Sequence, residues 1–68
     1  MTARMNLPAN LVVDGKRYAV TILCHTTRDR YKFRAEEALP LGRRWLPAGS
    51  IATHFCEFFT IKEASKWD

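Results

Sequence analysis

The chain has 68 residues, 47% of them apolar, and carries a formal net charge of +4 at neutral pH. A chain this short has room for one small core but little for an enclosed active-site pocket, and its apolar fraction is too high for a disordered protein. No apolar run approaches the roughly 18 residues that cross a bilayer, and the first residues lack the apolar segment of a signal peptide. We therefore expect a cytoplasmic protein with no membrane contact. Its positive net charge favours an anionic partner.

The start of the chain, residues 1–9, is expected to form a flexible arm, because Pro8 discourages a helix there. Residues 10–68 contain no internal repeat, low-complexity tract or linker. They are therefore predicted to fold as a single small domain.

The clearest local pattern is Asp14-Gly15, which separates two apolar runs. Both central residues of a type I′ turn need positive φ, which Asp and Gly tolerate better than most residues. A tight β-hairpin is therefore predicted here. Its opposed pairs are Val13 with Lys16 and Leu11 with Tyr18.

Two more strands are predicted, from Lys16 to about His25 and from Arg30 to Glu36. The second alternates apolar and polar residues cleanly, and the even positions of the first form one apolar face, although Ala19 and Leu23 lie on its other face. This is the pattern of a sheet with one buried face. A loop at Thr27-Arg28 brings the apolar residues of both strands to that face. The resulting pairs are Cys24 with Tyr31, Ile22 with Phe33 and Val20 with Ala35.

The next part of the chain gives a weaker pattern. Residues 37–50 carry the Pro and Gly residues of a long connection, with a short strand at Arg43–Leu46. The segment Ile51–Phe59 is apolar nearly all round, so its periodicity does not separate strand from helix. Its Thr and Phe content favours a strand.

The last residues carry a helix signal. Thr60 and Glu63 match a capping box, in which each side chain accepts a hydrogen bond from the other's backbone N–H. A short helix is predicted from Ile61 to Trp67. The alternative is one helix from Ser50 to Trp67.

The stretch from Phe59 to Trp67 also resembles the opening helix of excisionase and MerR-type winged helix-turn-helix domains. The likeness covers this stretch only. We expect no complete domain of that kind, because the sequence stops where the turn and the recognition helix would follow.

Together these elements predict an α+β fold that is mostly β: an antiparallel meander of three to four strands with a short C-terminal helix. The apolar content of residues 51–61 also indicates a homodimer contact. The predicted core comprises Leu11, Val13, Tyr18, Val20, Ile22, Phe33, Phe55 and Phe59, with Phe58 and Trp67 as further candidates.

The strongest candidate for a functional surface is the polar face of the meander, which gathers cationic side chains suited to carboxylates and phosphates. Tyr31 and Phe33 are predicted on the opposite face. The polar face therefore lacks the exposed aromatic residues on which single-stranded nucleic acids stack. The predicted members of this basic face are Arg17, Arg30, Lys32 and Arg34, with His25 at its edge.

A second candidate is the loop that contains Arg43, Arg44 and Trp45. Arginine and tryptophan are the residue types that most often anchor protein interfaces, and we predict that these three side chains contribute to binding. The alternative role for Trp45 is to cover the open end of a small core.

Metal, cofactor and catalytic chemistry are not expected. No Gly-rich phosphate loop, nucleophile elbow or His-Glu metal motif is present. Adjacent Cys24 and His25 would point to opposite faces of a strand and would not share a zinc ion. We expect Cys24 in the core, His25 on the surface, and both cysteines as free thiols.

Two functions of different class fit these features. The first is a non-enzymatic binding or inhibitor protein that docks its basic face on an acidic surface of a host protein or nucleoprotein complex. Phages and mobile elements encode short chains of this kind, such as anti-CRISPR and host-takeover proteins. The second is a DNA- or RNA-binding protein that contacts the phosphate backbone. The predicted absence of stacking aromatic residues favours the first.

Overall fold

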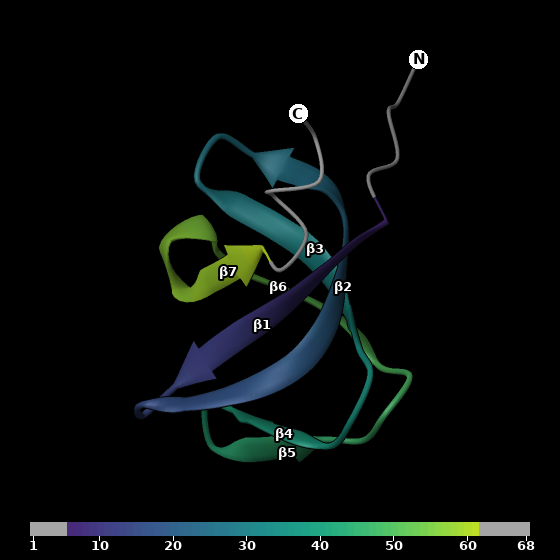
Figure 1. The fold of residues 1–68 in the computed structure, drawn as a ribbon, viewed down its shortest axis with the longest axis vertical. Coiled ribbons are helices and arrows are strands. Elements are labelled where there is room, and N and C mark those ends of the chain that lie inside the picture. The colour runs from purple at the N-terminus through teal and green to yellow at the C-terminus, as the bar shows by residue number, and fades with distance from the viewer. Residues whose placement is uncertain (1–5, 62–68) are drawn as a thin grey trace.

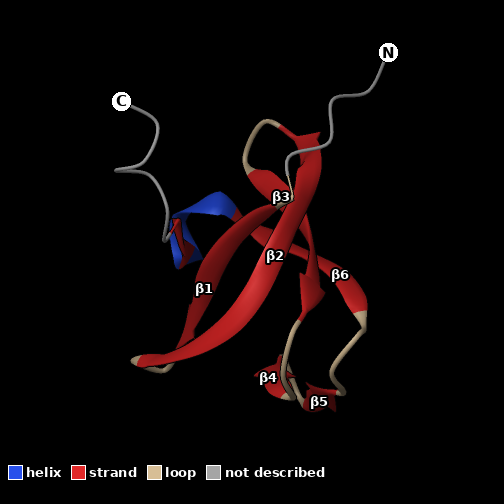
Figure 2. Ribbon diagram, turned by 45° about the vertical axis from the view of Figure 1, so that its right-hand side comes forward, coloured by secondary structure: helices blue, strands red, loops and turns tan. Residues whose placement is uncertain are grey.

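The computed structural model describes residues 6–61, which form two antiparallel sheets (Figure 1). The larger sheet has five strands in the order β6-β3-β2-β1-β7, and the smaller pairs β4 with β5. The described part is mostly β, with one short 3₁₀ turn, η1 (Cys56–Phe58), as its only helical element (Figure 2). The strands are β1 (Leu7–Val13), β2 (Lys16–Thr27), β3 (Arg30–Ala35), β4 (Leu39–Leu41), β5 (Arg44–Leu46), β6 (Ile51–Phe55) and β7 (Phe59–Ile61).

The first hairpin has the predicted turn and register. Asp14 and Gly15 have φ values of 50° and 78°, both positive as a type I′ turn requires. The pairs that flank the turn are Val13 with Lys16 and Leu11 with Tyr18.

This turn gives a direct test of backbone strain. A Cβ built on Gly15 meets no other atom within 4 Å, so the Gly15→Ala variant introduces no clash. It does force an L-residue into the left-handed region, which costs about 1–2 kcal/mol. We expect urea unfolding to show a loss of that size. Asp14→Asn is the control, because asparagine tolerates positive φ, and it should be nearly neutral.

The strand β1 begins earlier than the sequence indicated. It starts at Leu7, and Ala9 is fully buried, so residues 7–9 belong to the sheet and not to an arm. A proline is compatible with β1 at position 8 because β7 pairs only with Ala9 to Leu11. At Pro8 the strand has a partner on one side only, and a proline without an N–H is tolerated there.

The pairing of β2 with β3 follows the prediction over its first half and departs from it in the second. Val20 pairs with Ala35 and Ile22 with Phe33, as expected. A β-bulge at Leu23 then adds one residue to β2. The bulge shifts the side-chain alternation, so the predicted pair of Cys24 with Tyr31 is wrong. Cys24 pairs with Lys32, and His25 pairs with Tyr31.

Because of the bulge, the predicted faces of two residues are wrong. Cys24, expected in the core, shares the outer face with Lys32, and it is half-buried. His25 is exposed, as expected, but it lies on the same side of the sheet as Tyr31 and not on the outer face, and the two rings are 4.5 Å apart. A second bulge at Thr26 moves the turn to Arg28-Asp29, one residue later than predicted.

The core forms because the five-stranded sheet curls over its own inner face (Figure 1). Phe59, on the edge strand β7, packs against Phe33 with ring centroids 5.3 Å apart and against Tyr31 at 5.4 Å. β7 is thereby placed over β3, which is not its neighbour in the sheet. The fully buried residues are Ala9, Leu11, Val20, Ile22, Phe33, Ala35 and Leu39.

The small sheet lies at one end of this curled sheet (Figures 1 and 2). Leu39 of β4 is completely buried in the core, and Leu41 and Leu46 pack beside it. The predicted short strand at Arg43–Leu46 is present as β5, which begins one residue later. The connection therefore contributes a core residue that the prediction had not included.

The region after residue 50 forms two strands, and the alternative of one long helix is wrong. β6 ends at Phe55, η1 follows, and β7 occupies Phe59–Ile61. Ile61, the expected first helical residue, is thus in a strand, and the rest of the predicted helix, with Trp67, lies outside the described residues. None of the structure between residues 6 and 61 is a helix of bilayer-spanning length and hydrophobicity.

The predicted core also needs correction. Phe55 is paired with Arg30 and lies on the outer face, 38% exposed. Phe58 is equally exposed. Val13, Tyr18 and Phe59 are partly buried and pack against the core.

Candidate functional site

The basic face lies on the outer surface of the large sheet. Arg30, Lys32 and Arg34 alternate along β3 and are all exposed, whereas Phe33 between them is completely buried. Arg17 of β2 is exposed on the same face, opposite Val12. These four are the predicted cations, but their surroundings differ.

Arg34 is already engaged within the chain. Its Nε lies 2.9 Å from the Oε2 of Glu36, and the hydroxyl of Thr21 donates to the same oxygen at 2.7 Å. These two hydrogen bonds hold the pKa of the Glu36 carboxyl below its usual value, so the carboxyl stays ionised beside the guanidinium. The positive charge of Arg34 is therefore largely compensated.

Arg30 makes a contact that the sequence prediction missed. Its guanidinium carbon lies 4.7 Å from the centroid of the Phe55 ring, which is the distance of a cation–π interaction. The basic face therefore does carry an aromatic side chain, supplied by β6. One face of that ring is covered by Arg30, and the guanidinium keeps its hydrogen-bond donors for a partner.

Lys32 is the central cation of the face. It is flanked by Cys24 on β2 and by Thr53 on β6. Neither neighbour carries a charge, and no ion pair to Lys32 is found among residues 6–61. Its ammonium group is available for an anionic partner.

The outer face also presents apolar side chains next to these cations. Ile51 of β6 lies opposite Arg34 and is 56% exposed. Together with Phe55 it frames the small side chain of Thr53. The face is therefore a mixture of cationic and apolar groups.

The second predicted cluster sits on the separate β4-β5 hairpin. Gly42, with φ of 66°, forms the turn with Arg43. Both Arg43 and Arg44 are exposed, and Trp45 is 64% exposed while its ring meets Tyr18 edge-on at 6.3 Å. Tyr18 belongs to the inner side of the sheet, so this cluster does not merge with the basic face. Trp45 is too exposed to serve as a lid on the core.

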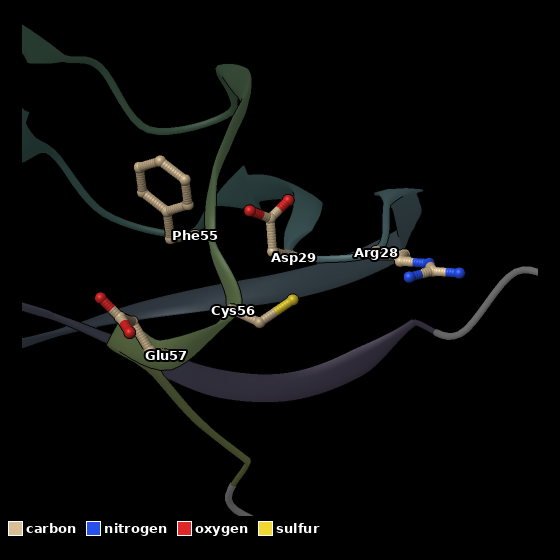
Figure 3. A pocket seen from close by; sticks show the side chains of 5 residues that line it. All are labelled: Arg28, Asp29, Phe55, Cys56 and Glu57. Carbon is tan, nitrogen blue, oxygen red and sulfur yellow. The ribbon is translucent and has the colours of Figure 1, made fainter.

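A pocket of about 520 Å³ lies beside the turn that joins β2 and β3 (Figure 3). Its lining holds acidic, basic and thiol groups from two segments of the chain. The thiol belongs to Cys56, whose backbone N–H donates to the carbonyl of Asp29 at 2.8 Å and so joins the two lining segments. The lining residues are Arg28, Asp29, Phe55, Cys56 and Glu57.

The side chains that could bind a metal ion lie apart from one another. Cys24 and His25 point to opposite faces of the sheet, as expected for adjacent residues of a strand, but each lies on the face predicted for the other. Across residues 6–61 no three His, Cys, Asp or Glu side chains gather closely enough to hold a metal ion. Both cysteines are free thiols.

His54 is the histidine that the fold perturbs. Its ring stacks on Phe58 at 4.9 Å with an interplanar angle of 20°. Burial lowers the pKa of His54 below its usual value, and the positive charge of Arg30 lowers it further. Both effects favour the neutral imidazole in the folded protein.

This neutral histidine predicts a pH dependence of stability. The unfolded chain takes up a proton near pH 6.5, whereas the folded chain resists it. The stability from His54 is present above that value and is lost as the pH falls through the lower folded pKa. Urea unfolding should show a smaller free energy at pH 5 than at pH 7.5. His54→Phe, which retains an aromatic ring for Phe58, should reduce this difference, and an unchanged difference would contradict the assignment.

A scan against protein-family models gives no match for this chain, and searches of curated proteins and of solved structures give none either.

Proposed function

We propose that the protein is a non-enzymatic binding protein that docks the outer face of its large sheet on an acidic surface of another protein or nucleoprotein complex. Short inhibitors and host-takeover proteins of phages and mobile elements, including anti-CRISPR proteins, act in this way. The observation that carries the proposal is the composition of one face, on which the uncompensated cations Arg30 and Lys32 lie beside exposed Ile51 and Phe55.

This mixture favours a protein partner over a nucleic acid. Protein interfaces combine apolar and aromatic anchors with arginine, and a charged rim steers association. A phosphate backbone offers nothing for Ile51 to contact. The ring of Phe55 is partly covered by Arg30 and is not presented as an open stacking platform.

Backbone binding to DNA or RNA remains the second candidate, and one observation supports it. Exposed cations occur on both the basic face and the β4-β5 hairpin, where Arg43 and Arg44 extend the positive surface. Cations spread over several surfaces suit a sequence-independent phosphate contact.

Affinity capture from nuclease-treated lysate of the source cells tests the proposal. The wild type should retain a protein partner after nuclease treatment. The double reversal Arg30→Glu with Lys32→Glu should lose it, because two attractive contacts become repulsive.

The matched control is Arg43→Glu with Arg44→Glu, which makes the same change in net charge on the hairpin. It should retain the partner if the basic face is the site. Loss of the partner from the hairpin variant alone would assign binding to the hairpin. Capture that disappears with nuclease would assign binding to nucleic acid.

A further inference from the structure

The edge of the large sheet at β6 is open. Within residues 6–61, β6 pairs with β3 alone and is the last strand on its side. An open edge presents backbone N–H and C=O groups that pair readily with another extended chain.

The hydrogen bonds at both ends of β6 show which of its residues face outward. The N–H of Ala35 donates to the carbonyl of Ser50 at 2.8 Å, and the N–H of Cys56 donates to the carbonyl of Asp29, also at 2.8 Å. Residues 50 and 56 thus direct their backbone groups toward β3. Because this direction alternates along an antiparallel strand, Ile51, Thr53 and Phe55 direct theirs toward the open edge.

Natural proteins usually protect such an edge with a charged residue, a proline or a bulge. β6 has the sequence Ile-Ala-Thr-His-Phe and contains neither a proline nor an acidic or lysine residue. Its pairing with β3 is regular over all five residues. The edge therefore lacks the usual features that prevent strand addition.

We propose that this edge accepts an acidic extended segment of the partner protein as an added strand, which deepens the proposed function. Charge determines the choice of occupant. The uncompensated cations on β3 next to this edge are Arg30 and Lys32, and a second copy would bring the same two cations toward it.

The geometry also specifies the segment. An added strand would lie about 10 Å from β3, with β6 between them. Thr53 is small, so a glutamate placed opposite it would extend over Thr53 toward the ammonium of Lys32. Apolar residues two positions before and after this glutamate would lie beside Ile51 and Phe55. The partner segment is therefore apolar-x-Glu-x-apolar in an extended conformation.

A synthetic peptide tests this pattern. The probe is the end-blocked peptide STVTETVTS, and the comparison peptide has lysine in place of the glutamate. Fluorescence polarisation should show the glutamate peptide binding at least tenfold more tightly. Equal binding of the two, or none, would overturn the proposal.

Two variants test the edge itself. Thr53→Pro removes an N–H that faces the open edge and leaves the hydrogen bonds to β3, so it should abolish peptide binding, while Thr53→Val should retain it. Thr53→Glu places an acid beside Lys32 within the chain and should reverse the preference in favour of the lysine peptide. This second variant remains informative if the proline variant does not fold.

The two proposals fail separately. If the peptide does not bind and Thr53→Glu retains the captured partner, but Arg30→Glu with Lys32→Glu loses it, the edge proposal fails and the proposed function stands. A wild-type dimer in sedimentation equilibrium that Thr53→Pro converts to a monomer would assign the edge to a second copy and overturn the acidic segment.

Discussion

Replacing Phe33 by alanine is expected to remove about 3–5 kcal/mol from the free energy of unfolding. Phe33 is the largest fully buried side chain, and it packs against Phe59 from the opposite edge of the sheet. The whole stability of a chain this long is roughly 3–10 kcal/mol. Thermal unfolding should therefore shift downward by roughly 15–30 °C, or the variant should not fold at all.

Phe55→Ala is the matched control, because it removes the same group from the outer face. Phe55 is 38% exposed, and its main specific contact is the cation–π interaction with Arg30. Its loss should cost less than about 1.5 kcal/mol. Equal losses for the two variants would show that Phe55 belongs to the core after all.

The second large effect is expected on binding. Arg30→Gln with Lys32→Gln should weaken the affinity for the captured partner by roughly 10²–10⁴-fold, because a desolvated charge-assisted contact contributes about 1.5–3 kcal/mol. The free energy of unfolding should change by only about 0.5 kcal/mol per substitution, since both side chains are exposed. Titration calorimetry measures the first quantity and urea unfolding the second.

The control for this variant is Arg34→Gln with Glu36→Gln, which removes an ion pair from the same face without changing the net charge. Because Arg34 already has its partner, the affinity should fall less than tenfold. A larger loss here than in the Arg30 and Lys32 variant would mean that Arg34 exchanges Glu36 for the partner on binding.

The first half of the fold was predictable because its signals are local. The Asp14-Gly15 turn and the period-two alternation of β3 each depend on a few neighbouring residues, and both are confirmed. The register is confirmed for the whole first hairpin, but for β2 with β3 only as far as the pair of Ile22 with Phe33. The same alternation identified Arg30, Lys32 and Arg34 as exposed cations. In a regular strand, side chains alternate between the two faces of the sheet, so one known cross-strand pair assigns the face of all the others.

After the bulge at Leu23, the alternation no longer predicts which face each β2 side chain occupies. An inserted residue exchanges the faces of everything after it, and no glycine marks it in the sequence. Cys24 and His25 were therefore assigned to the wrong faces. The exchange is stabilised by tertiary contact, since His25 then meets Tyr31.

The errors after residue 50 have a different cause. The segment Ile51–Phe59 is apolar nearly all round, so the pattern did not show that Phe55 faces outward. Its position follows from pairing with Arg30 on β3, which is far away in the sequence. β7 has only three residues, too few for any periodicity, and it forms because β1 offers an edge and the core accepts Phe59.

The claim that the basic face serves a protein rather than a nucleic acid is tested most directly by one titration. The wild type is titrated into labelled random-sequence duplex DNA at about 150 mM salt, near physiological ionic strength. We expect no saturable binding below about 10 µM, because few phosphate contacts are made and salt screens them. Sub-micromolar binding that is lost with Arg30→Gln and Lys32→Gln would contradict it and assign the face to the phosphate backbone.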